Sequence, residues 1–306
     1  MRIRATVAAV SGALALSAFV APAAHAAGTS FHHDSVVKAA QTAAQQHSGK
    51  SAFTATVDGD PYALNATFSA VKVNNGKSIV VGTTNTVKVP FSYTLTHGAD
   101  VNVTASDFVT SIDLYKGASF ESNDWDIVGT KAACTVKTTT TATCTGTVSI
   151  DPLELINSDA GTWKSAAFAV AYNGQNQTTP ADPSKIGVAV KDPAAANFYL
   201  QRLSKLTVNA APEPVKKGKT ITVTGALTRA NWETGKYAGY GTQSVKLQFK
   251  KKGATAYTTV KTIKTSTTGA LKTTVTASVD GTFRYSFAGT STTPAVNATG
   301  DYVDVQ

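Results

Sequence analysis

A short alternating stretch near the C-terminus, Asp280 to Gly289, most constrains what this chain can fold into. Phe283, Tyr285 and Phe287 fall on one face of an extended strand, because side chains in a strand alternate with a period of two. The Asp-Gly pair before the strand and the glycine after it accept the backbone angles of turns. We therefore predict a short antiparallel strand with one buried aromatic face, as is typical of a β-sandwich.

The first 26 residues have the pattern of a secretory signal peptide. Arg2 and Arg4 precede an apolar run from Ala5 to Val20, and Ala24-His25-Ala26 fits a small-x-small cleavage site. The run is shorter than the about 20 apolar residues of a spanning helix, and no later segment approaches that length. We expect a secreted protein, extracellular or loosely associated with the cell wall, that does not span a membrane.

Turn-forming residues divide the rest of the chain into many short strands rich in Thr and Val. Residues 27–62 differ in composition and predict an N-terminal arm that is either a short helix or a loosely ordered, disordered segment. Two β-sandwiches are expected after it, in residues 63–204 and 205–306. The segment 198–208 is the expected last strand and bridge, and the Pro-containing segment 210–214 is interpreted as a stiff linker.

Two strands show features that depart from simple alternation. Val87 to Leu95 alternates well, but Pro90 lies on its outward side and cannot donate a hydrogen bond, which predicts an edge strand or a bulge. In the strand predicted from residue 257 to Ile263, Val260 and Ile263 are out of phase with each other, which predicts a bulge or burial on both faces.

The chain contains two cysteines, Cys134 and Cys144, separated by β-prone residues that are mostly threonine. Export exposes them to an oxidising environment, so we predict a hairpin closed by a disulfide bond. A loop of this size contributes roughly 2 to 3 kcal/mol to stability in the chain-entropy treatment.

The positive charge is concentrated in the last third of the chain. Residues 27–204 hold 12 Lys and Arg against 14 Asp and Glu, whereas residues 205–306 hold 14 against 5, a net charge of +9. The expected partner of an exported basic domain is an anionic cell-envelope polymer, a glycan or another secreted protein, and no nucleic acid is expected. The alternative is that lysines occupy solvent-facing or edge positions and discourage aggregation between sheets. The lysines at such positions are Lys246, Lys250, Lys261, Lys264 and Lys272, and the candidate partner-binding lysines are Lys250, Lys251 and Lys252.

The second predicted sandwich resembles the bacterial immunoglobulin-like modules of actinobacterial exported proteins. The similarity lies in Val245 to Lys250, Gly269 to Val275 and Asp280 to Gly289. It implies an all-β chain of two tandem immunoglobulin-like β-sandwiches. Modules of this kind serve as spacers, stalks and adhesive units and share no activity. The cysteines are too close in sequence to form the inter-sheet bridge of antibody domains.

No catalytic motif is present, and neither an enzyme activity nor a cofactor is expected. His97 is the sole histidine inside a predicted domain, and no Gly-x-Ser-x-Gly elbow occurs. An acidic stretch next to Trp125, made of Glu121, Asp124 and Asp126, offers oxygen ligands for Ca²⁺ or a sugar. It lacks the spacing of an EF-hand, and a solvated acidic loop is the alternative.

Residues 231–240 show no alternation and are interpreted as a long loop at one end of the second sandwich. Trp232, Tyr237 and Tyr240, next to Lys236, could stack on a sugar ring or anchor a protein partner. They could equally cover the open end of the sandwich. The sequence therefore predicts a secreted binding or structural protein of the cell envelope, with Ca²⁺ or carbohydrate binding as the alternative.

Overall fold

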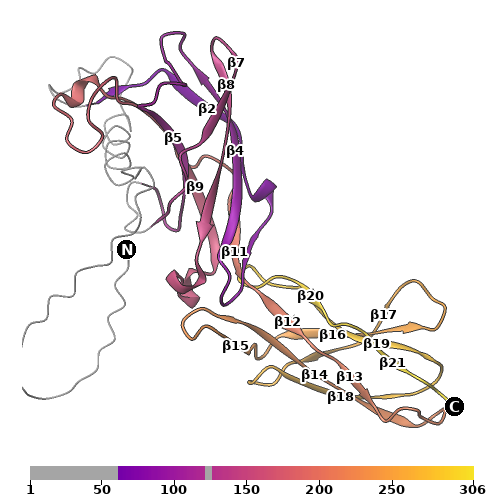
Figure 1. Ribbon diagram of the computed structural model, residues 1–306. Helices are drawn as coiled ribbons and strands as arrows, with labels where there is room; N and C mark the ends of the chain where they lie inside the picture. Colours follow the sequence, from indigo (N-terminus) through magenta and orange to yellow (C-terminus); the bar gives the residue numbers. More distant parts are fainter. Residues whose placement is uncertain (1–60, 121–125) are drawn as a thin grey trace, which may run out of the picture.

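The computed structural model describes residues 61–120 and 126–306, which form two β-rich units arranged one after the other (Figure 1). The predicted signal peptide and almost all of the arm lie outside these residues. The last residue assigned to the arm, Tyr62, belongs to the first strand of the fold. In the described part, regular structure consists of strands and four single-turn 3-10 helices. These are Asn74–Gly76, Pro152–Glu154, Asn157–Asp159 and Pro183–Lys185.

The first unit packs a seven-stranded sheet against a four-stranded sheet. The larger sheet contains β1 (Tyr62–Ala63), β3 (Ile79–Val81), β5 (Phe108–Tyr115), β6 (Asp126–Ile127), β9 (Gly161–Ala171), β10 (Gly187–Lys191) and β11 (Phe198–Arg202). The smaller sheet contains β2 (Ala66–Val73), β4 (Val87–His97), β8 (Thr141–Ile150) and β7 (Ala133–Thr138), in that order. Apolar side chains of both sheets share one core, which includes Phe91, Leu95, Ile112 and Trp163.

The second unit packs two five-stranded sheets against each other. One contains β12 (Ser204–Leu206), β13 (Asn209–Ala211), β14 (Thr220–Asn231), β15 (Lys236–Gly239) and β18 (Ala270–Thr276). The other contains β16 (Ser244–Lys251), β17 (Thr258–Lys264), β19 (Gly281–Phe287), β20 (Val296–Asn297) and β21 (Asp301–Val303).

The aromatic stretch from Phe283 to Phe287 lies in the central strand β19 of the second unit. Phe283, Tyr285 and Phe287 are all buried between the two sheets, as predicted. The Tyr285 hydroxyl donates a hydrogen bond of 2.9 Å to the carbonyl oxygen of Val223 on the facing sheet. The two pairs of packed sheets confirm the expected all-β class with two sandwiches.

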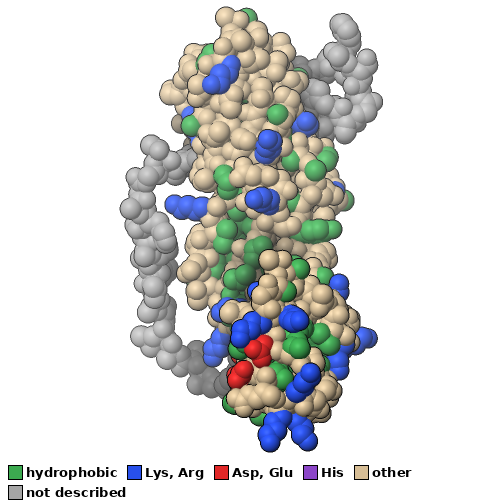
Figure 2. Space-filling view, turned by 90° about the vertical axis from the view of Figure 1, so that its right-hand side faces the viewer, with side chains coloured by type: hydrophobic (Ala, Val, Ile, Leu, Met, Phe, Trp, Pro, Cys, Tyr) green, Lys and Arg blue, Asp and Glu red, His purple; other side chains and the backbone are tan. Residues whose placement is uncertain are grey.

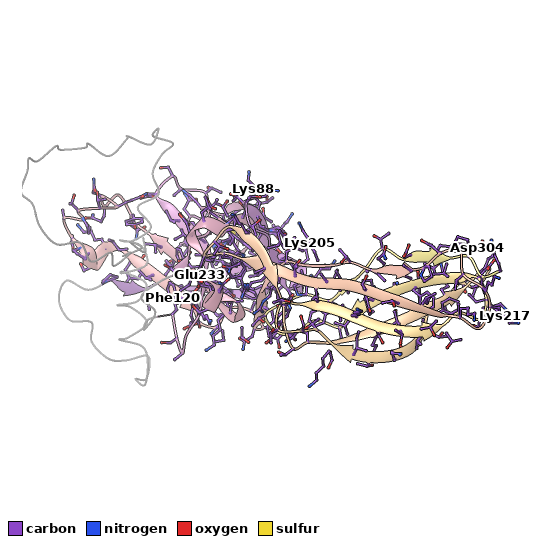
Figure 3. All side chains as sticks on the ribbon, turned by 90° about the horizontal axis from the view of Figure 1, so that it is seen from below. Lys88, Phe120, Lys205, Lys217, Glu233 and Asp304 are labelled. Atoms are coloured by element: carbon purple, nitrogen blue, oxygen red, sulfur yellow. A yellow bond between two sulfur atoms is a disulfide. The ribbon has the colours of Figure 1, made fainter. Side chains whose placement is uncertain are left out.

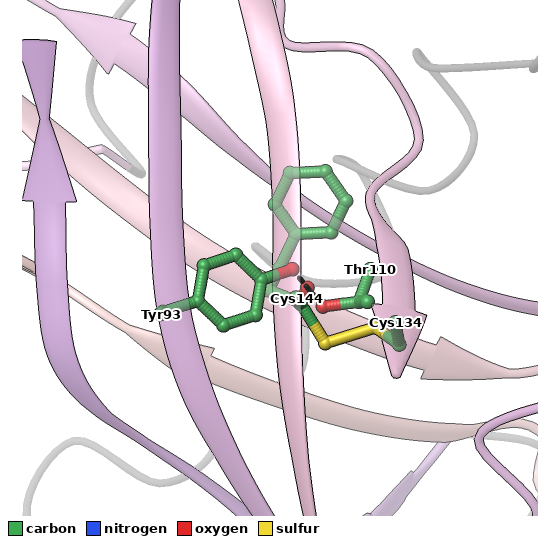
Figure 4. The surroundings of a disulfide bond; sticks show 5 residues. Tyr93, Thr110, Cys134 and Cys144 are labelled. Atoms are coloured by element: carbon green, nitrogen blue, oxygen red, sulfur yellow. Dashed lines mark hydrogen bonds between the residues drawn. A yellow bond between two sulfur atoms is a disulfide. The ribbon is translucent and has the colours of Figure 1, made fainter. Parts of the chain in front are cut away.

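The predicted disulfide is present and closes the β7–β8 hairpin, where Cys134 is paired directly opposite Cys144 (Figure 4). Beside it, Thr110 donates to the carbonyl oxygen of Phe168 at 2.7 Å. The Tyr93 hydroxyl therefore donates to Thr110 Oγ1, also at 2.7 Å. This chain of bonds links β4 of one sheet to β5 and β9 of the other, and burial raises the pKa of the Tyr93 hydroxyl.

Two sequence expectations about connections are wrong. The segment 210–214 is not a linker, because Asn209–Ala211 forms β13 and pairs with β14 inside the second sandwich. The segment 231–240 is not a loop, because β14 continues to Asn231 and pairs with β15 in a hairpin. The units are instead joined at Leu203, the residue between β11 and β12.

The two departures from alternation have different explanations. Strand β4 is not an edge strand, because it pairs with β2 on one side and β8 on the other. Pro90 is tolerated there because β2 ends opposite Phe91, so no β2 residue faces the proline. In β17 the register shifts around Val260, which confirms the predicted bulge.

Candidate functional site

The run of three lysines in the second sandwich does not form one patch. Lys250 lies on β16, with its Nζ 5.2 Å from the centroid of the Tyr257 ring. Lys251 ends that strand. Lys252 lies beyond it, with its Nζ 3.1 Å from Oδ2 of Asp280. The structure therefore assigns Lys250 to the sheet surface and its two neighbours to the end of the sandwich.

The end of the second sandwich remote from the first carries mixed charge. Figure 3 shows Lys217 and Asp304 there, and Figure 2 shows Lys and Arg side chains spread around a few acidic ones. Asp280 accepts a hydrogen bond from the Val305 amide, and this bond together with the Lys252 ammonium lowers the pKa of the Asp280 carboxyl. A shallow hollow of about 400 Å³ at this end is lined by Lys217, Lys251, Lys252, Ser278, Val279, Asp280, Val305 and Gln306.

The outer surface of the β16–β17–β19 sheet is more uniform in charge, and we call it the cationic face. Its members are outward-facing by strand alternation, because Val245 and Leu247 point into the core and their neighbours point away. The pairing of β16 with β17 and β19 brings four cations onto this surface. They are Lys246, Lys250, Lys264 and Arg284.

Tyr257 holds two of these cations in place. The Arg284 guanidinium lies 3.8 Å from the Tyr257 ring centroid, on the same ring that Lys250 approaches. Arg284 Nε also donates a hydrogen bond of 2.8 Å to Oε1 of Gln248 on the neighbouring strand. A cation over an aromatic face is stabilised by the ring quadrupole, so the guanidinium has a defined position. Sequence reasoning placed Lys246, Lys250 and Lys264 at solvent but did not bring them together with Arg284.

The structure assigns Trp232 to the joint between the two sandwiches. Its side chain is 1% exposed and belongs to the core of the first sandwich. Its Nε1 donates a hydrogen bond of 2.9 Å to the Gly82 carbonyl oxygen, and its backbone amide donates to Asn157 Oδ1 at 3.1 Å. The ring is therefore unavailable for stacking on a sugar, and the expectation of a partner-binding Trp232 is corrected to a structural role.

The other members of the predicted aromatic site lie close to this joint. The ring of Tyr237 is covered by the Lys205 ammonium, whose Nζ lies 3.6 Å from the ring centroid. The ring of Tyr240 is covered by Arg229 at 3.8 Å. Lys236 is exposed at the start of β15. Each tyrosine thus already has a cation on one face, and together with Trp232 they do not form an open aromatic platform.

Arg202, the last residue of β11, reinforces the joint. Its Nε donates a hydrogen bond of 2.6 Å to the Ala230 carbonyl oxygen of the second sandwich. Burial, together with the positive charge of Arg229, lowers the pKa of Arg202 to about 10. The guanidinium therefore remains protonated at neutral pH.

The predicted acidic site is only partly described. Glu121 and Asp124 lie outside the described residues, whereas Asp126 belongs to β6. Its carboxyl group is hydrogen-bonded to that of Asp113 on β5, which is fully buried. Burial and the charge of Asp126 raise the pKa of the Asp113 carboxyl well above its ordinary value, while a 3.2 Å hydrogen bond from the Gly129 amide opposes that rise. Asp126 therefore contributes to a buried carboxyl pair.

Two further features of the described residues bear on function. They contain no group of three or more His, Cys, Asp or Glu side chains arranged to hold a metal ion. Within the same residues, no helix has the length and hydropathy needed to cross a bilayer.

The sequence matches no protein-family model and no curated protein. Among solved structures, dimeric latent PorU from Porphyromonas gingivalis aligns with a TM-score of 0.26 and 9% identity over 78% of this chain and 20% of that one. The full ectodomain of mouse nectin-like molecule 4 aligns with a TM-score of 0.23 and 14% identity over 80% and 65%. The Yersinia pseudotuberculosis adhesin InvE aligns with a TM-score of 0.24 and 14% identity over 78% and 58%. This chain thus spans between one fifth and two thirds of the length of these structures, and at such TM-scores the likeness carries no weight for function.

Proposed function

We propose that this protein is a secreted, non-catalytic binding protein of the cell envelope, and that its second sandwich attaches it to anionic envelope material. The observation that carries the proposal is the net charge of +9 in residues 205–306, against −2 in residues 27–204. Several cations on one rigid unit attract a polyanion more strongly than any single ion pair, because their potentials add over the surface. The first sandwich is then the part presented away from the bound surface.

The joint between the sandwiches supports these separate roles, attachment by the second sandwich and presentation of the first. Trp232 and Arg202 connect the two units through buried contacts. Attachment through one sandwich therefore sets the direction of the other. A spacer or display role needs a fixed direction of this kind, whereas a flexible linker would not provide it.

The test is association of residues 27–306 with isolated cell envelope at low and high salt. We expect binding at about 0.02 M salt that is largely lost at about 0.5 M, because salt screens charges that lie at the surface. The test uses the whole mature chain, so neither sandwich has to fold on its own. Absence of binding at both salt concentrations, or binding that salt does not weaken, would overturn the proposal.

A further inference from the structure

The cationic face is almost free of neutralising charge. Strands β16, β17, β19 and β20 contain no Asp or Glu, and β21 contributes Asp301 alone. The Asp301 carboxylate accepts a hydrogen bond of 2.6 Å from the Ala210 amide of β13, in the facing sheet. It is therefore directed toward the facing sheet and away from Lys246 and Lys250. The four cations accordingly present a surface of one sign, unlike the mixed charge at the end of the sandwich.

The cations also follow the spacing of the sheet. Strand pairing defines successive rows across the face at Ser244, Lys246, Gln248 and Lys250 of β16. Each row carries one cation, because Ser244 is paired with Lys264 of β17, and Gln248 with Arg284 of β19. Rows two residues apart are separated by about 6.8 Å, so the four cations extend over roughly 20 Å.

This period matches a particular class of polymer. Two residues of an extended strand span six backbone bonds, and this distance is about 7 Å. A phosphodiester of a three-carbon polyol also repeats after six bonds, through phosphorus, oxygen, three carbons and oxygen. One phosphate can then lie opposite each row. A polymer with phosphates two bonds apart, or with anions on bulky rings, does not keep this match.

The groups between the cations suit a polyol. Thr262 and Ser286 are paired with Lys246, and Thr282 is paired with Lys250. These hydroxyls can donate to and accept from the hydroxyl groups of a polyol. The Tyr257 ring is covered by Arg284, so it positions a cation and leaves little free ring for stacking on a sugar. Tyr302 of β21 also lies on this face, because it is paired with Thr282, and its side chain is 42% exposed. The hydroxyl groups lie in the same rows as Lys246 and Lys250, where the polyol between two phosphates would reach them.

The opposite surface of the same sandwich has a different character. The outward residues of β14 there are neutral and include Thr220, Thr222 and Thr224. Two lysines lie on that surface: Lys272 of β18 is paired with Thr224, and Lys205 of β12 is paired with Thr228. The cationic face therefore differs from the opposite surface in the number of its outward cations, four against two, and in having one in each successive row.

From these observations we infer that the cationic face, through Lys246, Lys250, Lys264 and Arg284, binds a linear phosphodiester polymer of a three-carbon polyol. The inference rests on the proposed function and assigns its residues and ligand. Each phosphate accepts hydrogen bonds from a lysine or arginine side chain in its row, and no covalent step is involved.

Two triple variants of the mature chain test the site. The first carries Lys246→Glu, Lys250→Glu and Lys264→Glu on the cationic face. The control carries Lys216→Glu, Lys217→Glu and Lys219→Glu, which are exposed lysines in the turn before β14. Both variants change the net charge equally and leave the core untouched, and thermal melting verifies that both are folded. The dissociation constant for purified poly(glycerol phosphate) is measured at low salt.

We expect the first variant to lose about tenfold or more in affinity and the control to lose several-fold less. Equal losses would overturn the site. Replacing Tyr257 with Leu removes the aromatic support of Arg284 without changing charge and is expected to weaken binding about two- to fivefold. Unchanged affinity in that variant would contradict the proposed positioning of Arg284.

Competition experiments test the chemical identity of the ligand. Inorganic polyphosphate and poly-glutamate at equal charge concentration are expected to compete weakly, and stronger competition by either would overturn the six-bond match. Tighter binding to phosphatidylglycerol vesicles than to the polymer would likewise overturn it in favour of a membrane surface.

Salt-sensitive envelope binding that both triple variants lose equally would leave the proposed function standing and refute only the cationic face. Failure of the wild type to bind envelope would refute the proposed function itself.

Discussion

The indole of Trp232, in the second sandwich, donates a hydrogen bond of 2.9 Å to the carbonyl oxygen of Gly82, in the first. The side chain that makes this bond is buried in the core of the first unit, although Trp232 directly follows β14 of the second. Asn157 strengthens the contact by accepting from the Trp232 amide and donating to Asn231 Oδ1 at 2.9 Å. Trp232 therefore connects the second sandwich to the core of the first, together with Ala230 and Tyr237.

Replacing Trp232 with Ala should uncouple the sandwiches. We expect a loss of about 3 to 5 kcal/mol in unfolding free energy, the usual cost of truncating a buried aromatic. Chemical denaturation should then resolve two transitions in place of one. Tyr199→Ala, at a side chain 43% exposed on β11, serves as the control and should have little effect. A single transition at unchanged denaturant concentration in the Trp232 variant would contradict the coupling.

Reduction of the Cys134–Cys144 disulfide should destabilise the first sandwich and thereby lower the stability measured in the single unfolding transition of the coupled chain. The bridge closes a loop with a sequence separation of 10. Loop closure of this size contributes about 2 to 3 kcal/mol, chiefly by restricting the unfolded chain. Denaturation with and without reductant measures the difference, and the Cys134→Ala, Cys144→Ala double variant should be insensitive to reductant. Equal stability of oxidised and reduced wild type would rule out this contribution.

The buried Asp113 should make stability depend on pH in the sense opposite to most carboxyl groups. Its folded pKa is raised above the ordinary value of 3.8 by burial and by Asp126. The protonated form therefore contributes stability that is fully present below that value and is lost as the pH rises through the raised folded pKa.

The Asp113→Asn variant provides the measurement, because an amide has the shape of the protonated acid but cannot ionise. Relative to wild type, its unfolding free energy should increase as the pH rises above 3.8 and should level off once the pH exceeds the raised folded pKa of Asp113. Asp100→Asn, at an exposed turn residue, is the control. A difference between variant and wild type that is independent of pH would contradict the raised pKa.

Gly146 on β8 should tolerate no side chain. A Cβ built there would lie 2.3 Å from Cζ of Phe91, the residue paired with it on β4. The Phe91 ring is buried and stacked on Tyr93 with centroids 6.0 Å apart, so it has little room to move. Gly146→Ala should cost about 1 to 3 kcal/mol, and the control Thr145→Ala, at the exposed neighbour, about 0.5 kcal/mol or less. Thermal unfolding compares the two, and equal melting temperatures would refute the steric argument.

Features that depend on only a few adjacent residues could be predicted from the sequence. The alternation of Phe283, Tyr285 and Phe287 fixes which side chains share a face, whatever strands pair with β19. Cys134 and Cys144 are close enough in the chain that one hairpin brings them together. The bulge near Val260 followed from a phase change within a single strand. In each case the physical cause is local, so the pattern is sufficient.

Features that depend on contacts between distant residues could not be predicted. Residues 210–214 contain two prolines, which favour an extended segment, but only the pairing of Asn209–Ala211 with β14 decides that it is a sheet edge. The sequence around Trp232 is typical of an exposed binding site. Only the placement of Gly82 and Asn157 from the first sandwich buries its side chain.

The cationic face depends both on local sequence pattern and on contacts between distant residues. Alternation in β16 placed Lys246 and Lys250 on the outward side from the sequence alone. The rows that join them to Lys264 and Arg284 exist only through the register with β17 and β19. The sequence by itself determined the all-β class, the buried faces and the disulfide hairpin, because strand periodicity and chain proximity are local. The tertiary structure decided the joint and the arrangement of the cations, because strand register and domain packing depend on contacts between residues far apart in the chain.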